Sequence, residues 1–146
     1  MTTIESKYFI DTNVLIYSTF PEIDKYYNNA NKLLTENNNL FISNQIILEY
    51  INVSTNNKMF KNYLDIKTAF SNIEKYLTFI NVVENHNINA KELKNSAIKY
   101  NISKREIFDL NIYLTMKLNG IENLITFNVD DFKSFEGLNI ISALWE

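Results

Sequence analysis

Three acidic residues interrupt segments of the sequence that are otherwise apolar. Asp11 follows the short apolar run at residues 8–10, Glu49 lies between Leu and Tyr, and Asp109 lies between Phe and Leu. Burying an isolated carboxylate is costly, so such a group must be hydrogen-bonded, paired with a base, protonated or bound to a cation. These three residues are therefore the first candidates for a site that carries out chemistry.

Each carboxylate also has a simpler interpretation when it is taken alone. Asp11 can cap the helix that follows it, because Asp is a preferred N-cap residue. Asp109 can form a surface ion pair with Arg105, which stands four residues earlier in the same expected helix. Glu49 can face solvent, although the residues four positions before and after it are uncharged and give it no basic partner. The sequence leaves these alternatives open.

If the three carboxylates lie together, their hard oxygen atoms suit Mg²⁺ or Mn²⁺, which keep several waters and bind substrate phosphate. Such ions lower the pKa of a bound water and polarise a phosphoryl oxygen. Zinc is disfavoured because the chain has no Cys and only one His. That residue, His86, stands in a polar segment without a partner histidine, and we expect it to be solvated. The set favours phosphodiester hydrolysis without a histidine base.

The composition is that of an ordinary globular protein. Hydrophobic residues make up 46% of the 146 residues and charged residues 21%, which predicts a single domain over residues 1–146. The lack of Cys, of a long apolar run and of a basic leader favours a cytoplasmic protein with no membrane segment. The net charge of −3 argues against strong nonspecific nucleic-acid binding, so an RNA substrate needs a local basic patch or a metal.

Strand-like and helix-like segments alternate along the chain. Short apolar segments predict strands at residues 7–10, 40–42, 77–83, 124–127 and 138–141. Apolar periodicity predicts one helix that starts at Val14, one that follows Ser43 as its cap, and four that cover residues 24–36, 65–76, 89–100 and 103–118. The last of these opens with a Ser103–Glu106 capping box and is followed by Gly120. This alternation indicates an α/β fold with a mostly parallel sheet and a site beyond the carboxyl ends of its strands.

The motifs resemble those of the PIN-domain family. Residues 9–15, Phe-Ile-Asp-Thr-Asn-Val-Leu, are similar to the opening of a PIN domain, and Glu49 and Asp109 match its second and third acidic positions. Residues 126–132, Thr-Phe-Asn-Val-Asp-Asp-Phe, resemble its closing segment. The resemblance implies a PIN-like three-layer α/β/α sandwich with a mostly parallel sheet of about five strands.

The resemblance also assigns roles to individual residues. Asp11, Glu49 and Asp109 are expected to be catalytic and to hold Mg²⁺ or Mn²⁺. Asn128 stands where many relatives have a fourth acidic ligand, so it is a catalytic candidate that holds a second cation less strongly, and Asp131 can assist through water. The supporting candidates are Thr12, Asn13 and Thr126, which can orient ligands or water, and Arg105, which can meet a substrate phosphate.

The resemblance implies that the chain acts as a metal-dependent endoribonuclease on RNA, similar to the VapC-type toxins that a neighbouring antitoxin protein neutralises. Residues 24–36 and 55–76 are where relatives receive antitoxin or form a homodimer. The alternatives are a housekeeping RNA-processing nuclease and a non-catalytic PIN-like module that binds RNA or protein. A haloacid-dehalogenase phosphatase is disfavoured, because it needs a second Asp two positions after the first and this chain has Asn13 there.

Overall fold

Within residues 5–83 and 88–144, which the computed structural model describes, five parallel strands form one sheet in the order β3-β2-β1-β4-β5. His86 lies outside the described residues. The central position of β1 places the residue that follows it, Asp11, in the middle of the carboxyl edge of the sheet. The strands are β1 (Tyr8–Ile10), β2 (Leu40–Ile42), β3 (Ile80–Val82), β4 (Asn123–Thr126) and β5 (Asn139–Ser142).

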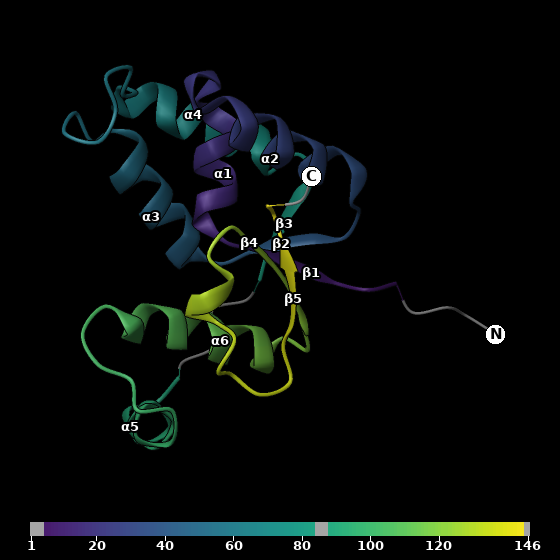
Figure 1. The fold of residues 1–146 in the computed structure, drawn as a ribbon, viewed down its shortest axis with the longest axis vertical. Helices are drawn as coiled ribbons and strands as arrows, with labels where there is room; N and C mark the ends of the chain where they lie inside the picture. Colours follow the sequence, from purple (N-terminus) through teal and green to yellow (C-terminus); the bar gives the residue numbers. More distant parts are fainter. Residues whose placement is uncertain (1–4, 84–87, 145–146) are drawn as a thin grey trace.

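Helices cover both faces of the sheet, which confirms the three-layer α/β/α arrangement. Figure 1 shows α1 to α4 on one side of the sheet and α5 and α6 on the other. The α-helices are α1 (Thr12–Thr19), α2 (Asp24–Glu36), α3 (Asn44–Ser54), α4 (Ile66–Tyr76), α5 (Ala90–Lys99) and α6 (Glu106–Leu118), and the short 3-10 helices cover Pro21–Ile23 and Val129–Asp131. In the described part of the chain, no helix has the length and apolar content to cross a membrane.

The central strands are short apolar runs because both of their faces are covered. Phe9 and Ile10 in β1 and Leu124 and Ile125 in β4 have no exposed surface. Strands of a parallel sheet buried on both faces carry continuous apolar residues, without the apolar–polar alternation of a half-exposed strand. The polar residues that follow these strands therefore mark the edge where the core ends.

One expected strand begins later than the sequence pattern indicates, and one expected helix is confirmed. The strand expected at 77–83 starts at Ile80, because Leu77 and Phe79 donate backbone hydrogen bonds to Ile73 and Tyr76 and form the turn after α4. The helix expected at 65–76 is α4, which starts at Ile66 after the capping Asp65 carboxylate and so forms the second part of the expected antitoxin or dimer segment at 55–76. The preceding residues 55–64 are turns and irregular backbone.

The capping box expected at Ser103 is wrong. Helix α6 starts at Glu106, and its N-cap residue, Arg105, makes no side-chain capping hydrogen bond. Lys104 has a φ of 55°, in the left-handed region, so the chain turns sharply here and cannot continue a right-handed helix. Ser103 contributes its carbonyl oxygen, which accepts from the backbone N–H of Glu106 at 3.2 Å. Ser43 does occupy the N-cap position of α3, but without a side-chain capping hydrogen bond.

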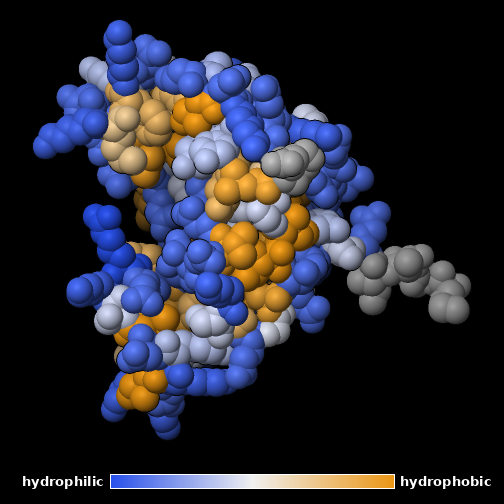
Figure 2. Space-filling view, viewed as in Figure 1, coloured by the Kyte–Doolittle hydropathy of each residue, from blue (hydrophilic) through white to orange (hydrophobic). Residues whose placement is uncertain are grey.

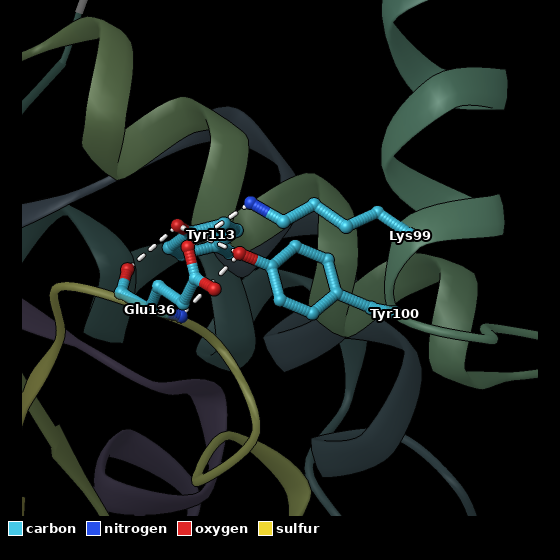
Figure 3. Close-up of polar contacts among 4 residues, drawn as sticks. All are labelled: Lys99, Tyr100, Tyr113 and Glu136. Carbon is cyan, nitrogen blue, oxygen red and sulfur yellow. Dashed lines mark hydrogen bonds and ion pairs between the residues drawn. The ribbon is translucent and has the colours of Figure 1, made fainter.

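A polar cluster ties α5 and α6 to the loop that precedes β5. The Tyr113 hydroxyl donates to the Glu136 carbonyl oxygen at 2.6 Å and lies 3.4 Å from the Tyr100 hydroxyl. Lys99 Nζ forms an ion pair with Glu136 Oε2 at 3.0 Å. Figure 3 shows the four side chains meeting at the Tyr113 hydroxyl and Glu136. Because Tyr113 is buried and the ion pair is exposed, we expect the Tyr113 hydrogen bond to contribute most of the stability.

We therefore expect Tyr113→Phe to lower the free energy of unfolding by about 1 kcal/mol, since it leaves the Glu136 carbonyl without its donor. Urea denaturation followed by circular dichroism measures the change. Tyr100→Phe is the matched control, and it should cost less because its hydroxyl contacts are longer, at 3.4 Å. Equal stability of the two variants would contradict the assignment.

Candidate active site

A cavity of about 320 Å³ opens beyond the carboxyl ends of β1 and β4, where the parallel-sheet argument placed the site. In the space-filling view the outline of the molecule is notched between α3 and α6 (Figure 2). The three predicted carboxylates Asp11, Glu49 and Asp109 line this cavity, although they stand far apart in the sequence. Its lining also includes Thr12, Asn13, Asn128 and Asp131 from the predicted set.

Asp11 is a helix cap and a cavity residue at the same time. Its side chain is nearly buried, and its Oδ1 accepts from the Thr12 backbone N–H at 2.8 Å. Its Oδ2 accepts from the Thr126 hydroxyl at 2.8 Å and from Asn13 Nδ2 at 3.3 Å. Burial raises the pKa of Asp11 to about 6, the hydrogen bonds lower it, and the charges of Glu49 and Asp131 add to the rise.

Glu49 is held beside Asp11 and is only partly exposed. Its Oε2 accepts from the Thr12 hydroxyl at 2.5 Å, and its Oε1 accepts from Gln45 Nε2 at 2.8 Å. Thr12 thus contacts both carboxylates, Asp11 through its backbone N–H and Glu49 through its hydroxyl. The interpretation that Glu49 simply faces solvent does not hold.

Asp109 lies on the α6 side of the cavity and is surrounded by like charges. Burial raises its pKa to about 7, and the charges of Asp131, Asp11 and Glu49 contribute in that order. Within residues 5–83 and 88–144, no ion pair joins Arg105 to Asp109, because Arg105 precedes the helix and is exposed. The Asp109 carboxylate therefore has no local base to explain it.

Asn13 and Thr126 join the end of β1 to the end of β4. The Asn13 amide nitrogen lies 3.3 Å from the Thr126 hydroxyl, and its oxygen accepts from the Phe127 backbone N–H at 3.2 Å. The fully buried Thr126 hydroxyl also accepts from the Asn128 backbone N–H at 3.0 Å. These contacts hold the Asp11 carboxylate in place and direct Asn128 to the cavity rim.

The oxygen ligands fit a hard cation in chemical type. Four carboxylates face one cavity, and among the described residues no Lys or Arg lines it. Oxygen-only ligands suit Mg²⁺ or Mn²⁺. Among the described residues, however, no three acidic or histidine side chains are gathered closely enough to hold a metal ion. Thr12, Gln45 and Thr126 occupy carboxylate oxygens, so ion binding would exchange some of these hydrogen bonds for metal contacts.

A sequence profile of the PIN domain matches residues 8–138 of the chain. The chain belongs to the PIN-domain family. The match includes every residue of the predicted site, and it confirms the resemblance drawn from the short motifs. Comparison with curated proteins gives no match.

Solved structures share this PIN fold at low sequence identity. VapBC from Salmonella typhimurium bound to DNA is 15% identical, with a TM-score of 0.66 over 96% of this chain and 100% of that one. VapBC2 from Rickettsia felis, bound to a DNA fragment from its promoter, is 23% identical, with a TM-score of 0.61 over 95% and 98%. VapC20 from Mycobacterium tuberculosis, a sarcin–ricin loop cleaving toxin, is 17% identical, with a TM-score of 0.61 over 88% and 95%.

Sequence reasoning missed Gln45, which contacts a cavity residue, and several residues that line the cavity. Gln45 donates a hydrogen bond to Glu49. Because side chains four residues apart lie on the same face of a helix, the spacing of Gln45 and Glu49 could have predicted this contact. Arg105, the predicted phosphate contact, is not among the residues that line the cavity. The missed residues that do line the cavity are mainly apolar: Ile16, Tyr17, Asn52, Val53, Met59 and Phe60.

Proposed function

We propose that this PIN domain is a metal-dependent endoribonuclease that hydrolyses RNA phosphodiester bonds with Mg²⁺ or Mn²⁺. The observation that carries the proposal is the set of four carboxylates around one open cavity whose lining, within residues 5–83 and 88–144, includes no Lys or Arg. Carboxylates that raise one another's pKa are costly in a folded protein and are typical of functional sites. A divalent cation offsets their mutual repulsion and makes the arrangement favourable.

Asp11, Glu49 and Asp109 would hold the cation, with Asn128 and Asp131 at the rim. A bound Mg²⁺ or Mn²⁺ supplies an activated water and polarises a phosphoryl oxygen. Thr126 and Asn13 keep the Asp11 carboxylate aimed at the cavity, and Thr12 does the same for Glu49. The apolar residues of the cavity lining offer an unstacked nucleobase a surface beside the scissile phosphate.

The chain would act as the toxin of a type II toxin–antitoxin pair, with an antitoxin protein as its partner. The likeness to VapBC structures over nearly the whole chain supports this proposal. A homodimer is the expected oligomer. Exposed apolar side chains on α4, Ile66 at 54% and Phe70 at 48%, offer a surface for a protein partner in the segment expected to receive one.

The decisive experiment is cleavage of total cellular RNA by the purified protein with Mg²⁺ or Mn²⁺, with and without EDTA. We expect cleavage that needs the metal and stops with EDTA. RNA binding without cleavage at any metal concentration would instead favour the non-catalytic PIN-like module. A small gene beside this one that encodes a DNA-binding protein would distinguish a toxin from a housekeeping nuclease.

We expect Asn128→Asp to tighten metal binding, because it adds a charged hard ligand at the rim where a neutral amide stands. The Mg²⁺ concentration for half-maximal RNA cleavage should fall, and calorimetric titration should show tighter binding. The control is Asp130→Asn, which changes a charge two residues away. It should leave metal binding unchanged, because Asp130 pairs with Lys133 and does not line this cavity. If the metal requirement of Asn128→Asp stays that of the wild type, Asn128 is not near the ion.

A further inference from the structure

Gln45 uses all the polar atoms of its side chain to join α3 to α6. Its Nε2 donates to Glu49 Oε1 at 2.8 Å and to the Phe108 carbonyl oxygen at 3.1 Å. Its Oε1 accepts from Asn111 Nδ2 at 2.6 Å. The two helices that Gln45 connects carry Glu49 and Asp109, the two carboxylates on opposite sides of the cavity.

Direct backbone contact between these two helices is sparse. Helix α3 packs against α1 and α4, whereas α6 packs against α5, and the backbones of α3 and α6 make few close approaches to each other. Figure 1 shows α3 in one helical layer and α6 in the other. On α6, Gln45 contacts the carbonyl of Phe108, which precedes Asp109, and the side chain of Asn111, which follows it by two residues.

The chemistry of the amide suits this position. Glu49 and Asp109 repel each other, so the two helices need a link that resists this repulsion. A Lys or Arg could form such a link, but its charge would weaken the attraction of the cavity for a cation. The neutral Gln45 amide donates one hydrogen bond to each side and leaves the negative charge of the cavity intact.

We propose that Gln45 is the positioning residue that fixes Glu49 relative to Asp109 and thereby sets the affinity of the cavity for a divalent cation. The inference rests on the proposed function, because it assigns to that metal site a residue outside the set of ligands. Partners that orient metal ligands typically change metal affinity by about 10- to 100-fold when they are mutated. Gln45 acts through the two carboxylates and does not contact the reacting atoms.

The test compares Mn²⁺ binding by calorimetry in the wild type and in Gln45→Ala. We expect the affinity to fall roughly tenfold or more. Asn111→Ala, which removes the donor to Gln45 Oε1, should give a smaller loss and serves as a second probe if Gln45→Ala folds poorly. Asn44→Ala is the matched control, since Asn44 is the exposed neighbour of Gln45 on the same helix and should leave the affinity unchanged.

Two further readouts separate positioning from a merely structural role. In RNA cleavage, Gln45→Ala should raise the Mn²⁺ concentration for half-maximal rate but keep kcat close to the wild-type value at saturating Mn²⁺. In a Glu49→Gln background, Gln45→Ala should cause little additional loss of Mn²⁺ affinity, because the carboxylate through which it acts is gone. Equal Mn²⁺ affinity of wild type and Gln45→Ala overturns this inference alone. A wild type that binds no Mn²⁺ overturns the proposed function together with it.

Discussion

Replacing Asp109 with Asn is expected to abolish RNA cleavage and to relieve the slowed growth that expression of the wild-type chain should cause. The change keeps the shape of the side chain but removes a negative charge from the cavity that would hold the cation. A metal ion supplies several kcal/mol of transition-state stabilisation, and about 1.4 kcal/mol corresponds to tenfold in rate, so we expect a loss of at least about a hundredfold. Single-turnover cleavage of RNA with Mg²⁺ or Mn²⁺ measures it.

The matched control is Glu106→Gln, which removes the same charge from an exposed carboxylate one turn earlier on α6. This variant should retain activity, because Glu106 does not line the cavity. Asp109→Asn should also be at least as stable as the metal-free wild type at pH 8, since burial and neighbouring carboxylates raise the pKa of Asp109 to about 7 and make its charge unfavourable there. An Asp109→Asn variant that remains toxic and active would show that catalysis lies elsewhere.

Without metal, the stability of the fold is expected to fall as the pH rises from about 4 to 8. Asp11 and Asp109 have pKa values of about 6 and about 7 in the folded chain, above the ordinary value of 3.8. The folded state therefore binds more protons than the unfolded state between these values, so its stability decreases as the two carboxyls ionise. For buried Asp11 the loss is about 3 kcal/mol. Asp109 is partly exposed, so each unit of its pKa shift costs less stability because solvent screens its charge.

Urea unfolding in EDTA across this pH range measures the effect. Asp11→Asn isolates the contribution of Asp11, because an amide oxygen can still accept from the Thr12 N–H while the titrating group is gone. The variant should lose stability less steeply than the wild type between pH 4 and 8. Adding Mn²⁺ at pH 8 should raise the Tm of the wild type more than that of the variant. Parallel pH profiles for the two proteins would contradict the assigned pKa of Asp11.

The alternation of strands and helices was predictable because it depends on residues close together in the chain. The apolar runs of β1, β2 and β4 are buried on both faces, as their composition indicates, and the helix periodicities gave α2 its bounds and located α4 and α6. Errors occurred at element ends, where a single backbone angle decides the outcome. Lys104 in the left-handed region shifts the start of α6 to Glu106, and nothing in the side-chain pattern at 103–106 indicates that angle.

The sequence by itself singled out the residues that we propose for chemistry: three carboxylates in apolar surroundings, each at a position that a parallel sheet can bring to one edge. Tertiary structure decided how they are held, because the partners are distant in the chain. Thr126 reaches Asp11 across 115 positions, Thr12 reaches Glu49 across 37, and Asn111 reaches Gln45 across 66. Such hydrogen bonds need a donor and an acceptor within about 3 Å at a favourable angle, a condition that depends on how strands and helices pack and not on local sequence.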